Sequence, residues 1–497
     1  MGEDNSRQAD QSLFEDPGAA FARVYRKAMN RRRFMGIAGA YLAGAVGIDA
    51  VLNACAPGSS SSSSNQSTSS TAKPGGIKVI NFFTTEDDPA TQDALKAAIA
   101  DYESKNTDTH ISFILISGDE RDERARTGLS VGQDLGIFEV DRSYSPAFVR
   151  AGYLHQLDSL INAVGADQFV VGSRQQIDGH DWVFPYGAGP FCLWYRTDLM
   201  SAPKTVSDVK AAAKDHTGGG KYGISLAVGD TGAVYDTLPQ FIFANGGDYW
   251  DTKGNVVYGS DAVRQAIQDC VDLLHYAPPG NTNWSPFKFI TNFISGLTAM
   301  SPWAGRLGVN AWAQKSPYEK VANVVRPPYN PSNVGLVRWS NLAVDKKTAY
   351  PDDALKFMQF LFTGDWGVKY ANSVPGQLVP SIKSTRDAAI NDKSNGFVQA
   401  HPDWVATLYN QTPYGTDLGG PMGATSSGTL KLYNGPGAPW SQTAFGAKNV
   451  DMQMLQKIML QNMSVKDAHA WAVDTYKGIV KDYKSKNPNW KPPANAA

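Results

Sequence analysis

The sequence has little of what several functional classes require. Three cysteines in 497 residues exclude a scaffold held by many disulfides. None of the seven histidines lies near another, so no HxH or HExxH metal motif exists. Lys and Arg total 46 against 47 Asp and Glu, which lacks the basic excess of a nucleic-acid binder. Hydrophobic residues make up 42% of the chain, enough for a large core in two or three folding units.

Two glycine motifs resemble catalytic or cofactor sites but stand in the wrong context. Residues 128–132 fit G-x-S-x-G, yet charged residues precede them and an apolar strand follows, the reverse of a nucleophile elbow. Residues 218–223 fit G-x-G-x-x-G, but a helix precedes and a strand follows, which favours a flexible turn over a dinucleotide site. We therefore predict no catalytic residues, no metal and no cofactor.

The first 54 residues have the order of an export signal. Residues 30–36 match the twin-arginine pattern, and the apolar stretch 35–52 is too rich in Gly and Ala for a strong membrane span. The stretch ends in Leu52-Asn53-Ala54-Cys55, which resembles a bacterial lipobox. We predict a lipoprotein signal at 1–54 with lipid on Cys55; an uncleaved anchor helix with a chance cysteine is the alternative.

A serine-rich segment follows Cys55. Residues 55–76 contain an unbroken Ser run and cannot bury enough apolar area to fold, so they predict a flexible tether. A folded domain on such a tether would be held outside the cytoplasm, on the outer face of the bacterial cell membrane. Cys192 and Cys270 fall in apolar elements and are expected to be core thiols, although they could pair in an oxidising compartment.

The body alternates predicted strands and helices. A strand at 77–83, a helix at 90–102 and a strand at 110–116 form a βαβ opening, which argues for an α/β fold with a parallel sheet. Further elements are predicted as strands at 135–140, 223–228 and 342–344 and helices at 207–214, 261–276, 351–363 and 464–483.

Several short segments, each a weak signal alone, occur together in a characteristic order. They are Gln133-Asp134, Asp141-Arg142, Ala151 to Leu154, Asp178 to Pro185, Leu193 to Leu199, Phe243 to Gly247, Phe293 to Met300 and a C-terminal helix opening at Ser464. This order resembles the family 1 extracellular solute-binding proteins of ABC importers, the group that includes maltose-binding protein. The resemblance covers about residues 77–485.

The resemblance implies a two-lobed periplasmic-binding-protein-like fold that closes on a ligand held in a cleft between the lobes. By analogy, one lobe would hold residues 77–187 and 340–390, and the other 188–339 and 391–497. Gly189 and Arg196 depart from the maltose-binding pattern, where an acidic residue and an Asn are usual, so maltose itself is not the expected ligand.

The residue chemistry agrees with a sugar. The chain has 12 Trp, 21 Tyr and 21 Phe, and sugar rings stack on aromatic planes while their hydroxyls bind carboxylates, amides and Arg. The resemblance and the strand ends predict these ligand-binding residues: Phe138, Asp141, Arg142, Tyr186, Tyr235, Asp236, Trp303, Trp339, Asn341 and Trp440. Each has an alternative role. Asp141 could cap a helix, the Trp and Phe residues could pack in the core, and the others could be solvated surface.

We therefore predict a monomeric, non-enzymatic lipoprotein that captures a carbohydrate of oligosaccharide size and delivers it to ABC permease subunits. No nucleic-acid partner is expected. One alternative is a secreted polysaccharide-active enzyme, which would need two carboxylates flanking a cleft. Another is a binding protein for a peptide, polyamine or metal ion; a polyamine would favour several cleft carboxylates alongside aromatic rings.

Overall fold

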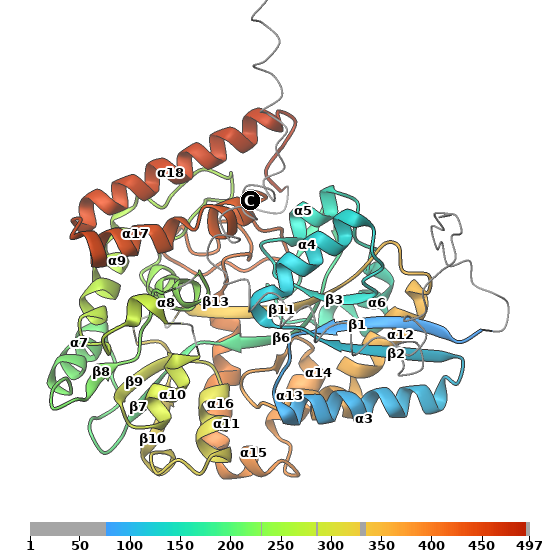
Figure 1. Ribbon diagram of the computed structural model, residues 1–497, viewed down its shortest axis with the longest axis horizontal. Coiled ribbons are helices and arrows are strands. Elements are labelled where there is room, and N and C mark those ends of the chain that lie inside the picture. Colours follow the sequence, from blue (N-terminus) through green and yellow to red (C-terminus); the bar gives the residue numbers. More distant parts are fainter. Residues whose placement is uncertain (1–75, 230, 285–286, 329–333, 494–497) are drawn as a thin grey trace, which may run out of the picture. The chain divides into compact units, whose positions relative to one another are not determined.

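The computed structural model describes residues 76–229, 231–284, 287–328 and 334–493 (Figure 1). The predicted signal at 1–54, the lipidated Cys55 and the tether up to residue 75 lie outside the described residues. Among the described helices, none is long and apolar enough to cross a membrane.

The first sheet has the strand order β12-β6-β11-β3-β1-β2, with β13 paired to β11. Strand β1 runs parallel to β2 and β3, and β11 runs antiparallel to β3 and β6. The strands are β1 (Lys78–Thr84), β2 (Thr109–Leu115), β3 (Ile137–Val140), β6 (Phe184–Pro190), β11 (Gly335–Val344), β12 (Val379–Pro380) and β13 (Gly415–Thr416). A small hairpin, β4 (Gln176–Ile177) and β5 (His180–Asp181), lies apart from this sheet.

Helices cover both faces of the first sheet because its strands are apolar on both sides. Phe82 points into a cluster with Leu95 and Phe357, whereas Phe83 points into a second cluster with Leu129. The helices of this half are α3 (Pro89–Lys105), α4 (Arg121–Val131), α5 (Ser145–Arg150), α6 (Asp158–Val164), α12 (Pro351–Phe362), α13 (Gly364–Ala371) and α14 (Lys383–Ile390). We call this half the first lobe.

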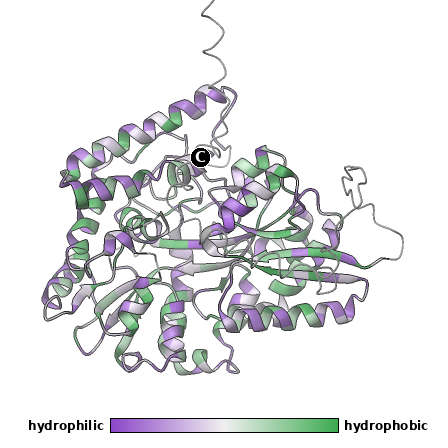
Figure 2. Ribbon diagram, in the orientation of Figure 1, coloured by the Kyte–Doolittle hydropathy of each residue, from purple (hydrophilic) through white to green (hydrophobic). Residues whose placement is uncertain are grey.

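The second sheet has the order β10-β7-β9-β8. Its strands are β7 (Cys192–Arg196), β8 (Tyr222–Ile224), β9 (Thr298–Trp303) and β10 (Ala322–Val325). The helices that belong with it are α7 (Val206–Asp215), α8 (Thr231–Ala244), α9 (Asp261–Leu274), α10 (Lys288–Ile294), α11 (Arg306–Ala313), α15 (Gly396–Ala400), α16 (Pro402–Gln411), α17 (Val450–Gln461) and α18 (Val465–Lys486). We call this half the second lobe. Hydrophobic residues concentrate along the strands, while hydrophilic ones alternate along outer helices such as α3 (Figure 2).

Short helical turns complete the described chain. They are η3 (Gly118–Glu120), η4 (Ala166–Gln168), η5 (Asn281–Asn283), η6 (Glu319–Val321), η7 (Thr412–Tyr414) and the π-helical turn η8 (Gln442–Ala447).

The chain passes between the sheets after β6 and again after β10. Strand β6 of the first sheet ends at Pro190, and β7 of the second begins at Cys192, so a single residue separates them. Strand β10 of the second sheet leads into β11 of the first. These crossings bring the ends of strands from both sheets to the same region of the molecule.

Most predicted elements are confirmed, with ends that match or are shifted by at most three residues. Two strands were wrong in length: the strand predicted at 223–228 stops at Ile224, and the one predicted at 342–344 begins at Gly335. Ser225 N still donates to the Met300 carbonyl of β9 at 2.9 Å, whereas Val228 N donates to the Asn281 carbonyl, away from the sheet. The long β11 pairs with β6, β3 and β13, which short-range patterns do not reveal.

The glycine motifs have the predicted structural context. Ser130 lies in the last turn of α4 and donates to the Thr127 carbonyl at 2.8 Å, so it is not a nucleophile elbow. Gly218 to Gly220 form a turn with positive φ between α7 and β8. Cys192 and Cys270 are both buried free thiols, as expected of core residues.

Candidate functional site

Charged residues follow the ends of strands from both sheets. Glu86 stands two residues after β1, Asp141 directly follows β3, and Arg306 begins α11 three residues after β9. Ligands of open α/β sheets bind at the carboxyl ends of strands. The meeting place of these ends is therefore the candidate site.

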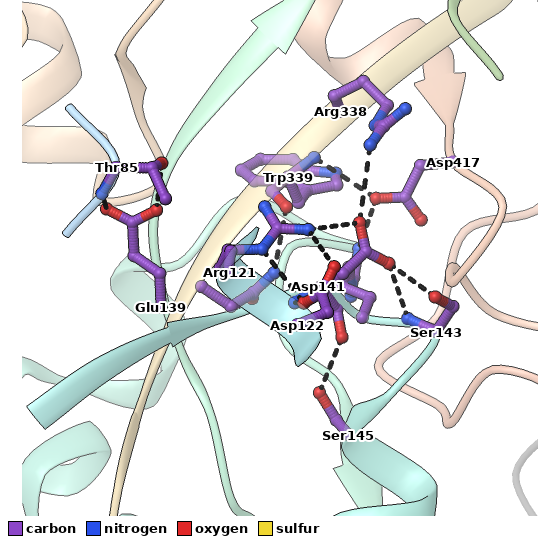
Figure 3. Close-up of polar contacts among 12 residues, drawn as sticks. Thr85, Arg121, Asp122, Glu139, Asp141, Ser143, Ser145, Arg338, Trp339 and Asp417 are labelled. Atoms are coloured by element: carbon purple, nitrogen blue, oxygen red, sulfur yellow. Dashed lines mark hydrogen bonds and ion pairs between the residues drawn. The ribbon is translucent and has the colours of Figure 1, made fainter. Parts of the chain in front are cut away.

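Asp141 is the centre of a polar network (Figure 3). Its Oδ1 accepts from the backbone N and Oγ of Ser143, at 2.9 and 2.7 Å. Its Oδ2 lies 3.3 Å from Arg121 Nη2 and 3.4 Å from Arg338 Nη2. Burial alone would raise the pKa of Asp141, but the two arginines and Ser143 lower it to about 2, so the side chain is ionised.

Arg338 extends the network toward the second lobe. It lies on β11, and its Nη1 is 3.0 Å from Oδ1 of Asp236 on α8. At the other end, Arg121 forms a two-bond pair with Asp122, at 3.0 and 2.8 Å. Alternating charges thus run Asp122–Arg121–Asp141–Arg338–Asp236, a line that we call the ionic chain.

Asp417 flanks the ionic chain. One of its carboxylate oxygens, Oδ2, accepts from the Trp339 backbone N at 3.2 Å (Figure 3) and lies 3.9 Å from Arg142 Nη1. The other oxygen, Oδ1, is buried and has no hydrogen-bond partner among the described residues. Burial raises the pKa of Asp417, with Arg142 acting against it.

A second polar group joins the two lobes near β1. Arg306 Nη2 lies 3.1 Å from the Glu86 carboxylate, and its Nη1 is 3.5 Å from Asp87 and 3.9 Å from Asp88. The Tyr186 hydroxyl donates to Glu86 at 3.4 Å. Burial and the charge of Glu139 raise the pKa of Glu86 to about 7, although Arg306 opposes them.

Glu139 connects this second group to the ionic chain. It precedes Asp141 by two residues on β3, so both side chains leave the same face of the strand. Its carboxylate accepts from the Thr84 hydroxyl and from the N and Oγ1 of Thr85, the latter two at 2.9 and 2.6 Å. Its charge also acts on Arg121.

Aromatic rings lie beside these charges. Trp303 ends β9 and packs edge-on against Phe191 and Phe289, each with 5.3 Å between ring centroids. Tyr186 stacks on Phe362 at 5.2 Å. Tyr235 precedes Asp236 and meets Phe445 of the π-helical turn η8 edge-on at 5.6 Å. Trp339 and Asn341 lie on β11, and the Asn341 amide donates to the Trp339 carbonyl at 3.0 Å.

Seven of the ten predicted residues are buried: Phe138, Arg142, Tyr186, Trp303, Trp339, Asn341 and Trp440. Three of these seven have contacts that give them a structural role. Phe138 packs in the first-lobe core with Leu129 and Phe148. Arg142 is 1% exposed and donates to the carbonyls of residues 172, 173 and 174. Trp440 is 1% exposed and sits among Trp250, Tyr483 and Trp490. These contacts give Phe138, Arg142 and Trp440 a structural role. Ligand contact by these three residues stays a prediction.

Unsatisfied polar atoms gather on the predicted residues. Five of the ten hold a buried polar atom with no partner among the described residues: Arg142 Nε, Tyr235 Oη, Trp303 Nε1, Asn341 Oδ1 and Trp440 Nε1. Buried polar groups are rarely left unpaired, so these atoms call for water or a ligand.

Sequence reasoning missed the arginines of the site. Arg121, Arg306 and Arg338, with Glu86 and Asp417, form contacts between segments far apart in the chain. Glu86 and Arg306 could have been identified from their position in the sequence, because each closely follows the end of a strand. Within the part of the chain that the structure describes, no three His, Cys, Asp or Glu residues could hold a metal ion.

Comparison with known proteins places this geometry in context. The family model described as bacterial extracellular solute-binding protein matches residues 88–366. No curated protein matches the chain.

Solved structures match the fold closely. Maltose-bound MalE3 of T. maritima has a TM-score of 0.65 at 18% identity, covering 81% of this chain and all of that one. The GacH receptor of Streptomyces glaucescens, solved free and with acarbose, has a TM-score of 0.66 at 15% identity and covers 82% and 99%. UgpB of Mycobacterium tuberculosis, solved with glycerophosphocholine, has a TM-score of 0.65 at 17% identity and covers 82% and 100%.

Proposed function

Because the chain belongs to the bacterial extracellular solute-binding protein family, we propose that it captures a carbohydrate outside the cytoplasm and delivers it to an ABC permease. The observation that carries the proposal is the meeting of Asp141, Arg338 and Asp236 beside several aromatic rings. Carboxylates and guanidinium groups bind sugar hydroxyls, and rings stack on sugar faces. MalE3 was solved with maltose and GacH with acarbose, which supports a saccharide here.

Capture would work by a shift between open and closed lobes. A ligand that touches groups of both lobes stabilises the closed state by its difference in affinity for the two states. The proposed lobe ranges are 77–187 with 340–390, and 188–339 with 391–497. The unpaired polar atoms of Tyr235, Trp303 and Asn341 would gain partners when a hydroxylated ligand binds.

The proposed anchor is a lipid on Cys55 with the tether at 55–76. Changing Cys55→Ser should release the chain from the membrane fraction into the soluble fraction, while a control in the serine run, Ser64→Ala, should stay attached. Retention of the Cys55 variant in membranes would contradict lipid anchoring.

A thermal-shift screen of the purified chain tests the function. A ligand that binds only the folded state must raise the melting temperature. We expect a shift with at least one mono- or oligosaccharide and none with amino acids or peptides. A shift with peptides alone would contradict the carbohydrate assignment, and release of reducing ends from an oligosaccharide would indicate an enzyme instead.

A further inference from the structure

The region between the lobes holds more acids than bases. Its described carboxylates are Glu86, Asp87, Asp88, Asp122, Glu139, Asp141, Asp236 and Asp417, and its described cations are Arg121, Arg142, Arg306 and Arg338. Acids exceed arginines by eight to four, and they still exceed them when Glu86, whose pKa is raised to about 7, is counted as neutral. The net charge of the whole chain is only −1.

The arginines are already shared or committed. Arg338 serves both Asp141 and Asp236, and Arg306 serves Glu86, Asp87 and Asp88. The Nη1 and Nη2 atoms of Arg142 donate to three backbone carbonyls, and Nη1 only approaches Asp417, at 3.9 Å. The protein's own cations therefore do not balance its carboxylates.

Two buried acceptors without partners point the same way. Asp417 is 8% exposed and Asn341 is 1% exposed, and each has an Oδ1 with no partner among the described residues. Asn341 lies on β11 and pairs in register with Val140, the residue before Asp141. Oxygen acceptors are satisfied by a donor such as N–H or O–H.

We propose that the solute received here carries a positive charge, as an amine- or ammonium-bearing saccharide or polyol. The inference rests on the proposed solute-binding function and narrows its substrate class. A cationic nitrogen would supply both the donor that Asp417 and Asn341 lack and the charge that the acids leave unbalanced. Rings such as Trp303 and Tyr186 would favour the same group through cation–π attraction.

The same excess of carboxylates disfavours binding of an anionic solute. A uronate or phosphate placed among these carboxylates would meet like charges, which costs several kcal/mol at a recognition site. The raised pKa of Glu86 agrees, because burial and neighbouring Glu139 disfavour one more negative charge there.

The test is calorimetric titration of the full chain with size-matched disaccharides at about pH 6. The probes are chitobiose with free amines, its neutral diacetylated form, and cellobiose; spermidine serves as a cation without a sugar. We expect chitobiose to bind about tenfold tighter than either neutral disaccharide, which is one partly buried charge contact. The preference should shrink as NaCl rises from about 50 to about 500 mM.

Matched variants test which carboxylates cause the preference for the amine-bearing disaccharide. Asp417→Asn keeps an acceptor for the Trp339 amide but removes the charge, and Asp236→Asn does the same on α8; each should reduce the preference for chitobiose. Asp272→Asn is the control, since that carboxylate pairs with Lys210 away from the site. Melting temperatures of all variants show that they fold.

The outcomes separate the two claims. Equal binding of neutral and amine disaccharides would overturn the charge inference and leave the carbohydrate function standing. Binding of spermidine with no saccharide would keep the charge inference and overturn the carbohydrate function. No binding by chitobiose or spermidine, or an unchanged preference in both site variants, would overturn the charge inference.

Discussion

The Arg306 guanidinium lies 3.1 Å from the Glu86 carboxylate, and the pair joins helix α11 of the second lobe to the loop after β1 of the first. Both side chains are mostly buried. A buried pair at this position links the lobes directly, so closure depends on more than the ligand.

Removal of Arg306 should weaken the closed state. In Arg306→Gln the Glu86 carboxylate loses its cation while it stays buried, and breaking such a pair typically costs about 3–5 kcal/mol. Because the open state exposes Glu86 to water, we expect the loss to fall mainly on closure. The readout is the distance between labels on α3 and α7, measured by pulsed electron paramagnetic resonance without ligand.

A matched control is Arg196→Gln, which breaks a pair with Asp198 inside the second lobe. The Arg306 variant should lengthen the label distance and the Arg196 variant should not. Equal distances in both variants would show that the Glu86 pair does not govern closure.

Glu86 should also make stability depend on pH. Its pKa is raised from 4.5 to about 7 in the fold, so its stabilising contribution is complete below pH 4.5 and is lost as the pH rises through about 7. The loss is on the order of 3 kcal/mol. The free energy of unfolding should therefore fall more between about pH 5 and about pH 8 in the parent chain than in Glu86→Gln. Parallel curves for the two proteins would contradict a raised pKa.

Arg142 is expected to stabilise the fold and not to contact the ligand. Its guanidinium donates to three successive carbonyls at 3.0–3.1 Å, and no lysine could reach all of them from one point. Both Arg142→Lys and Arg142→Met should lower the free energy of unfolding by about 3 kcal/mol or more. Denaturant titration measures this, with Arg264→Lys on the exposed face of α9 as the control. A stable variant with lost ligand affinity would instead assign Arg142 to the site.

The sequence pattern predicted those helices and strands that depend mainly on neighbouring residues. The βαβ opening was visible because Leu95, Ala98, Ile99 and Tyr102 recur at helical spacing and all are buried. Asp141 was predicted as a polar residue directly after an apolar strand, and it does follow β3. Asp236 was predicted to precede a helix, but it lies within α8. Ligand contact by either residue stays a prediction. Their contact through Arg338 was not predicted, because it depends on how β11 of the first sheet is placed beside α8 of the second lobe.

Aromatic residues were the hardest to assign. A ring contributes similar burial in a core and in a ligand site, so composition cannot separate the two. Phe138 and Trp303 both end up on strands; Phe138 faces a closed core, whereas Trp303 keeps an unpaired Nε1. The difference appears only when the opposite sheet and its helices are in place.

Trp440 provides a direct test of packing against ligand contact. Its ring lies 5.1 Å from Trp490, 5.5 Å from Tyr483 and 5.7 Å from Trp250, in each case edge-on. Such a cluster stabilises the C-terminal helices against the rest of the second lobe. Truncation to Ala would leave a large cavity, so Trp440→Ala should lower the free energy of unfolding by about 3–5 kcal/mol.

Phenylalanine separates the two roles of Trp440. Trp440→Phe keeps most of the buried ring and loses only the Nε1 donor, which has no partner among the described residues. If packing is its role, the Phe variant should regain most of the stability and bind saccharide as the parent does. If the ring or its N–H touches the solute, the same variant should be stable yet bind more weakly in calorimetric titration. The side chain that the resemblance assigns to the ligand would then reach it only after the lobes rearrange from the conformation described here.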